Sequence, residues 1–159
     1  MNVSIIGSGN VATNLGKALK LANVKVLNIW SQRFENAQTL AAEIDAKAIT
    51  DLSLIDKNSD IILISVKDDA ITEVSAQIHN YKGLVAHTSG AVGFDTLKQH
   101  QNYGVFYPLQ TFSKQKELDF SQVPLCLEAN NLANLATLKT LAEAVSNSIY
   151  EVNSEQRKT

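Results

Sequence analysis

Near its start the sequence reads Val3-Ser4-Ile5-Ile6-Gly7-Ser8-Gly9-Asn10-Val11-Ala12-Thr13-Asn14-Leu15-Gly16, a short apolar strand that runs directly into Gly-x-Gly-x-x-Ala and then into a helical pattern. Gly7 permits a tight turn, Gly9 lets a pyrophosphate approach the backbone, and Ala12 allows close packing of helix on sheet. The helix N-terminus adds unpaired N–H groups and a positive dipole end. This context predicts a dinucleotide site, and a glycine-rich turn in another α/β domain is the alternative.

Composition indicates a globular domain and excludes several classes of protein. The 159 residues are 45% hydrophobic and 19% charged, which is enough apolar material for one domain with its own core. The net charge is −2 and the pI is near 5.9, with no basic stripe, so nucleic acid is not expected as the main partner. The apolar runs at 61–66 and 83–86 are far too short to span a bilayer, so no membrane partner is expected.

Cysteine and histidine usage bears on redox compartment and metal binding. Cys126 is the single cysteine, so no internal disulfide forms, and its apolar surroundings predict a buried core thiol. His79, His87 and His100 are far apart in the sequence and from the cysteine, so no metal site is expected. Because Met1 leads directly into the first strand, no signal peptide is expected and a cytoplasmic location is predicted.

Strand and helix patterns alternate along the chain. Strands are expected at 2–6, 25–30, 48–49, 60–66, 83–87, 104–107, 123–128 and 149–152. Helices are expected after Gly9 and at 35–44, 70–78 and 132–145, with short helices at 51–55 and 95–100. Near-continuous apolar strands suit a parallel sheet covered on both faces, so the fold class is α/β, a doubly wound, mostly parallel sheet. A ligand should bind at the carboxyl ends of the strands, near the switch point.

The tip of the second strand predicts which dinucleotide binds. NAD-binding domains commonly carry an acidic residue here, whereas this chain has Ser31-Gln32-Arg33. A hydroxyl and a guanidinium suit a 2′-phosphate, so NADP is predicted over NAD. A solvated loop arginine is the alternative interpretation of Arg33.

The tip of the fourth strand adds further candidates. Val66 is placed to pack on a ring and Lys67 to reach a ribose or phosphate, while the Asp68–Asp69 pair has helix capping as its alternative role. The predicted cofactor-binding residues are Gly7, Ser8, Gly9, Asn10, Val11, Ser31, Gln32, Arg33, Val66, Lys67 and Asp68.

The segment after the fifth strand holds the candidates for chemistry. His87 is predicted as a catalytic proton donor, with a hydrogen-bonded structural histidine as the alternative. Thr88, Ser89 and Gly90 are predicted to bind substrate through hydroxyl and backbone N–H groups. At the end of the next strand, Tyr107 or Gln110 faces the pocket, or this segment forms a structural corner.

With these residues in view, the chain resembles pyrroline-5-carboxylate reductase, the deazaflavin-dependent NADP reductases and the wider 6-phosphogluconate-dehydrogenase-like superfamily. Gly7-Ser8-Gly9-Asn10-Val11-Ala12, Ser31-Gln32-Arg33 and Ile64-Ser65-Val66-Lys67-Asp68-Asp69-Ala70-Ile71 carry this resemblance. A closer one, to a family of bacterial NADP oxidoreductases, rests on His87-Thr88-Ser89-Gly90-Ala91, Tyr107-Pro108-Leu109-Gln110-Thr111-Phe112 and Val123-Pro124-Leu125-Cys126-Leu127-Glu128. It covers essentially the whole chain.

The resemblance implies a Rossmann NADP-binding domain over residues 1–153. It also implies that residues 154–159 are a polar tail leading into an all-helical domain absent from this chain, which would supply dimer contacts and much of the substrate pocket. A homodimer is therefore expected for the full-length protein.

The function expected is that of an NADP-dependent oxidoreductase, or its cofactor domain, acting on a small carbonyl, imine or hydroxy-acid substrate. A non-catalytic NADP-binding or redox-sensing module is the alternative. Methyl transfer with S-adenosylmethionine is disfavoured, because Ser31-Gln32-Arg33 offers no acidic residue for the ribose hydroxyls.

Overall fold

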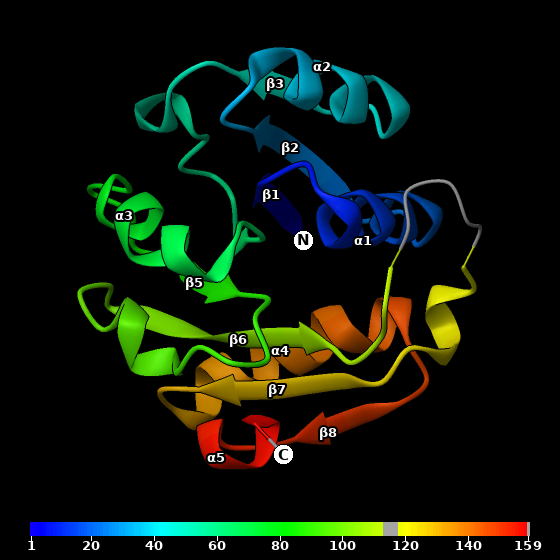
Figure 1. Cartoon of the computed structure of the whole chain (residues 1–159), viewed down its shortest axis with the longest axis vertical. Coiled ribbons are helices and arrows are strands. Elements are labelled where there is room, and N and C mark those ends of the chain that lie inside the picture. The colour runs from blue at the N-terminus through cyan, green and yellow to red at the C-terminus, as the bar shows by residue number, and fades with distance from the viewer. Residues whose placement is uncertain (113–117, 159) are drawn as a thin grey trace.

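The computed structural model describes residues 1–112 and 118–158, which contain one eight-stranded sheet in the order β3-β2-β1-β4-β5-β6-β7-β8 (Figure 1). The strands are β1 (Asn2–Ile6), β2 (Lys25–Trp30), β3 (Lys47–Ile49), β4 (Ile61–Ile64), β5 (Leu84–His87), β6 (Asn102–Pro108), β7 (Leu125–Ala129) and β8 (Ile149–Glu151). The first six are parallel, β7 runs antiparallel to β6, and β8 is parallel to β7. The order 3-2-1-4-5-6 is that of doubly wound dinucleotide-binding sheets, which confirms the predicted fold class.

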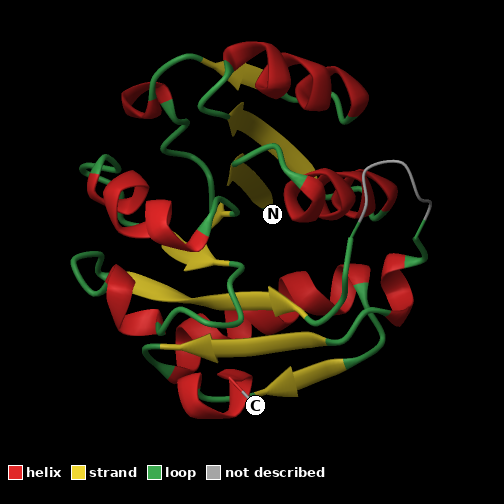
Figure 2. Ribbon diagram, viewed as in Figure 1, coloured by secondary structure: helices red, strands yellow, loops and turns green. Residues whose placement is uncertain are grey.

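The helices follow the strands as expected, and two further ones, α5 at Ser154–Lys158 and the 3-10 helix at Phe120–Gln122, were not predicted (Figure 2). The α-helices are α1 (Asn10–Leu21), α2 (Phe34–Glu43), α3 (Ile71–Ala76), α4 (Leu132–Val145) and α5 (Ser154–Lys158), and the 3-10 helices are Leu52–Leu54, Asp68–Ala70, Phe94–Leu97 and Phe120–Gln122. Residues 154–158 of the predicted polar tail therefore form α5, which carries the buried Arg157, while Thr159 lies outside the described residues.

Alternating strand residues place two hydrophobic cores on opposite faces of the sheet. Ile5 and Leu63 belong to the core under α1, α2 and α4, whereas Ile6 and Ile64 belong to the core under α3. Apolar burial on both faces explains why the central strands read as continuous apolar runs. Cys126 is buried, as predicted.

The topological switch lies between β1 and β4, which pair directly. The chain leaves β1 toward α1 on one face, and leaves β4 toward α3 on the other. A crevice therefore opens above the carboxyl ends of these strands, where ligands of open α/β sheets bind.

Candidate functional site

A cleft of about 1070 Å³ lies at the carboxyl ends of the parallel strands. It gathers most of the predicted site residues, namely 7–11, 31–32, 66–68 and 88–90. Arg33 and His87 are the two predicted residues absent from its described lining. Segments that are far apart in the sequence thus converge on one site.

Gly7 makes the turn out of β1 in a conformation that requires glycine. Its φ is +130°, and a Cβ at this position would lie 2.0 Å from the carbonyl oxygen of Ser65. Its N–H donates to the carbonyl of Trp30 at 2.7 Å, which ties the turn to β2. The turn is therefore fixed by both neighbouring strands.

Gly9 ends the turn and begins α1, and it leaves space in the cleft. No described atom lies within 4 Å of a Cβ built on it. The first turn of α1 holds no acidic residue. The N–H groups at the start of this helix, from Asn10 onward, have no carbonyl partner within the helix. Open space beside unpaired N–H groups and a positive dipole end is the environment that a pyrophosphate requires.

The tip of β2 lies beside this loop. The Oγ atoms of Ser8 and Ser31 are 2.8 Å apart and share a hydrogen bond, and Trp30 and Gln32 also line the cleft. Arg33 is exposed at the N-cap of α2. The structure thus places Ser31 at the site and leaves the guanidinium of Arg33 in solvent.

The face of α3 and the preceding turn form a wall that the sequence analysis did not name. Ala70, Glu73, Val74 and Gln77 line the cleft, and their spacing is that of one helical face. That spacing, next to a strand tip, was the available signal. Asp68 and Asp69 lie in the first turn of the 3-10 helix, whose N-cap Lys67 makes no side-chain capping bond.

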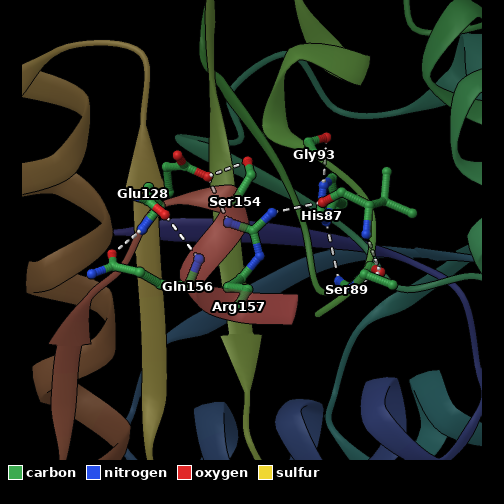
Figure 3. A network of polar contacts seen from close by, with 10 residues as sticks. His87, Ser89, Gly93, Glu128, Ser154, Gln156 and Arg157 are labelled. Atoms are coloured by element: carbon green, nitrogen blue, oxygen red, sulfur yellow. Dashed lines mark hydrogen bonds and ion pairs between the residues drawn. The ribbon is translucent and has the colours of Figure 1, made fainter. Parts of the chain in front are cut away.

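His87 is fully buried and bonded at both ring nitrogens (Figure 3). Its Nδ1 accepts the N–H of Ser89 at 3.1 Å, so the ring proton belongs on Nε2, which donates to the carbonyl of Gly93 at 3.2 Å. Burial lowers the pKa of His87, partly opposed by the hydrogen bond to Gly93. These contacts favour the alternative of a structural histidine, and the catalytic role stays a prediction that turnover of His87→Ala would test.

Ser89 presents a hydroxyl that acts only as a donor toward the cleft. Its Oγ accepts the N–H groups of Ala91 and Val92, both at 3.1 Å, and these two bonds fill its lone pairs. The proton has no acceptor among the described residues, and Ser89 lines the cleft. It is therefore free to donate to a carbonyl, carboxylate or imine group of a ligand.

Tyr107 and α5 close the same end of the cleft. Tyr107 packs on Gly90, where an added Cβ would lie 2.5 Å from its Cζ. Arg157 and Lys158 also line the cleft, and no sequence signal marked them, because they stand in a polar segment without a motif. The interpretation that Tyr107 faces the pocket agrees with this geometry.

Other kinds of site find no support in the part of the chain that the structure describes. No group of three His, Cys, Asp or Glu residues there is arranged to hold a metal ion. No described helix is long and apolar enough to cross a membrane.

The sequence profile of the Rossmann-like domain family matches residues 1–111. The chain belongs to this family. A Bacteroides fragilis protein described as an NADP oxidoreductase has a crystal structure that matches with a TM-score of 0.95 and 37% identity, covering 99% of this chain and 62% of that one. The pyrroline-5-carboxylate reductase of Aquifex aeolicus is 27% identical over 103 residues, which are 62% of this chain and 37% of that protein.

A pyrroline-5-carboxylate reductase from Coxiella burnetii matches with a TM-score of 0.77 at 18% identity, covering 98% of this chain and 60% of that one, which shows the shared fold. The chain therefore spans between 37% and 62% of the lengths of these relatives. The predicted Rossmann domain, and the resemblance to a pyrroline-5-carboxylate reductase and to a bacterial NADP oxidoreductase, are confirmed.

Proposed function

We propose that this chain is the NADP-binding domain of an oxidoreductase that transfers a hydride between the nicotinamide and a small carbonyl, imine or hydroxy-acid substrate. The observation that carries the proposal is the Gly7–Gly9 turn, which leaves open space at the N-terminus of α1 inside the switch-point cleft. The relative described as an NADP oxidoreductase, which is 37% identical, supports the same conclusion.

The order of the strand-end loops along the cleft would orient the cofactor. The pyrophosphate would lie on Gly9 and the first turn of α1, the adenosine toward Ser31 at the tip of β2, and the nicotinamide toward the loop after β5. Ser31, the exposed Arg33 and the absence of a carboxylate in 31–33 favour the 2′-phosphate of NADP.

When bound, the cofactor would supply the hydride. The residues of this chain would orient the cofactor and stabilise the charge that develops on the substrate. The Ser89 hydroxyl would donate a hydrogen bond to the substrate atom that gains negative charge, because its own lone pairs are filled by backbone N–H groups. Tyr107 forms the apolar wall behind Gly90, and the neutral ring of His87 keeps the loop in this shape.

The first test is a calorimetric titration with NADPH and NADH. Wild type should bind NADPH more tightly than NADH, and Arg33→Ala should weaken NADPH alone, by about 1.5–3 kcal/mol for a charged hydrogen bond. Lys139→Ala, which removes an exposed cation on α4, is the charge-matched control. Equal affinity for the two nucleotides would contradict the NADP assignment, and no binding of either would contradict the proposed function.

A non-catalytic NADP-binding module is the second candidate, and the burial of His87 favours it, because that ring has no nitrogen free for proton transfer. Turnover of a panel of carbonyl, imine and hydroxy-acid substrates by the longest natural form of the protein separates the two candidates.

A further inference from the structure

Arg157 is a buried cation that joins three parts of the fold (Figure 3). Its side chain is 1% exposed, and it extends from α5. One terminal nitrogen, Nη1, donates to Oε1 of Glu128 on β7 at 2.5 Å, and the other, Nη2, donates to the carbonyl of Val92 at 2.6 Å. The guanidinium thus links β7 to the loop after β5.

Val92 is held at both of its backbone groups. Its N–H donates to Oγ of Ser89 at 3.1 Å, while its carbonyl accepts from Arg157. One residue further on, the carbonyl of Gly93 accepts from the ring of His87. The loop that carries Ser89 and Gly90 into the cleft is therefore closed by hydrogen bonds of Ser89 and His87 within the loop and anchored to α5 by Arg157.

The surroundings of Arg157 make this anchor difficult to replace. Glu128 is 13% exposed in its side chain and also accepts from the hydroxyl of Ser154 at 3.0 Å. Removal of the guanidinium would leave a shielded carboxylate and the Val92 carbonyl without their charged partner. The Nε atom of Arg157 is buried and has no partner among the described residues, so the two terminal nitrogens account for the observed anchoring.

We propose that Arg157 is a positioning residue for the nicotinamide end of the cleft: through Val92 it fixes the loop from which Ser89 and Gly90 face the ligand. This inference rests on the proposed function, because that function assigns the nicotinamide to this end. The adenosine end is built on β1 and β2. The described hydrogen bonds of Arg157 go to Glu128 and Val92, and neither residue lies on β1 or β2. Loss of Arg157 should therefore affect one half of the ligand.

Two probes separate the halves: NADPH, and 2′-phospho-ADP-ribose, which lacks the nicotinamide. Both titrations can be followed by the fluorescence of Trp30, the single tryptophan, which lines the cleft. The variant is Arg157→Met, which keeps a long apolar side chain and removes the hydrogen bonds. Lys139→Met on α4 is the matched control, and circular dichroism and thermal unfolding confirm that each variant is folded.

Arg157→Met should weaken NADPH about tenfold, the effect of one well-placed hydrogen bond, and leave 2′-phospho-ADP-ribose within about twofold. If Arg157→Met does not fold, Glu128→Gln decides, because it keeps an acceptor for Arg157, removes the charge, and should show a smaller loss in the same direction. Equal weakening of both probes, or of neither, in a folded variant would overturn the positioning role. Failure of wild type to bind either probe would instead overturn the proposed function, and this inference with it.

Discussion

Gly7 and Gly9 are two residues apart in one turn, but they serve it in different ways. Gly7 is required by the fold, since its φ is +130° and a Cβ would meet the Ser65 carbonyl. Gly9 is required by the proposed ligand, because a Cβ there meets no described atom and would only fill the space for the pyrophosphate. Stability and binding are therefore separable within this motif.

The pair Gly7→Ala and Gly9→Ala tests this separation. Gly7→Ala should lower the free energy of unfolding by more than about 2 kcal/mol, from backbone strain and the clash together. Gly9→Ala should leave that free energy unchanged or up to about 1 kcal/mol higher, and weaken NADPH at least about tenfold. Urea unfolding and NADPH titration, both followed by Trp30 fluorescence, measure the two effects. Unimpaired NADPH binding by Gly9→Ala would place the pyrophosphate elsewhere.

The two buried histidines should make stability depend on pH. Burial lowers the pKa of His87 and, separately, that of His100, which contacts Ser75. Below about pH 6.5, the usual histidine pKa, the unfolded chain then binds protons that the folded chain does not. This contribution to stability is complete above that pH and is lost as the pH falls toward the lower pKa of the folded state.

We therefore expect the free energy of unfolding to decrease from pH 7 to pH 5, with a slope of at most about 1.4 kcal/mol per pH unit for each histidine. Urea unfolding at a series of pH values gives this slope. His87→Gln and His100→Gln should each reduce it, and the double variant should nearly remove it. An unchanged slope in the double variant would show that other groups control the pH dependence.

At the scale of the elements, the sequence predicted what the backbone pattern determines and missed what depends on tertiary contacts. The apolar pattern at 132–145 predicted α4 with its observed ends, and the strand at 25–30 was predicted equally well. Residues 154–158 read as polar, because α5 has five residues and its inward face consists of Arg157, whose burial depends on Glu128 from β7. A charge that is paired across distant segments leaves no periodic signal in the sequence.

The same limit applies to the candidate site. Glycine chemistry and strand-tip position were sufficient to predict residues 7–11, 66–68 and 88–90 in the cleft. They were not sufficient to separate Ser89, which faces the cleft, from His87, two residues earlier and fully buried. The alternation of side chains at the end of a strand does not show which hydrogen bonds close the loop that follows.

The packing of α4 gives a test of how an element is held. Leu138 is fully buried in the core between α4 and the sheet, whereas Leu132, at the start of the same helix, is 84% exposed. Leu138→Ala should lower the free energy of unfolding by about 2–5 kcal/mol, and Leu132→Ala by less than about 0.5 kcal/mol. Urea denaturation compares the two variants. Similar losses in the two variants would show that burial in the core does not determine how α4 is held.

At the scale of the whole molecule, the cleft brings together segments from both halves of the sheet. The glycine turn follows β1, Ser89 follows β5, and Arg157 stands near the end of the described chain. A ligand that spans the cleft would therefore contact the loop after β1 and the loop after β5 at the same time. Binding to such a site should stabilise the fold as a unit and in proportion to ligand concentration.

NADPH at 100 times its Kd should raise the free energy of unfolding by about 2.7 kcal/mol, because it binds the folded state alone. Amide hydrogen exchange should slow in the loops after both β1 and β5 when NADPH is bound, whereas 2′-phospho-ADP-ribose should protect the loop after β1 alone. Gly9→Ala gives the control, since it should keep the fold and gain no more than about 1.4 kcal/mol at the same NADPH concentration, as a tenfold weaker Kd requires. Protection by NADPH confined to one loop would mean that the ligand does not span the cleft, and the assignment of the nicotinamide to the Ser89 loop would then be wrong.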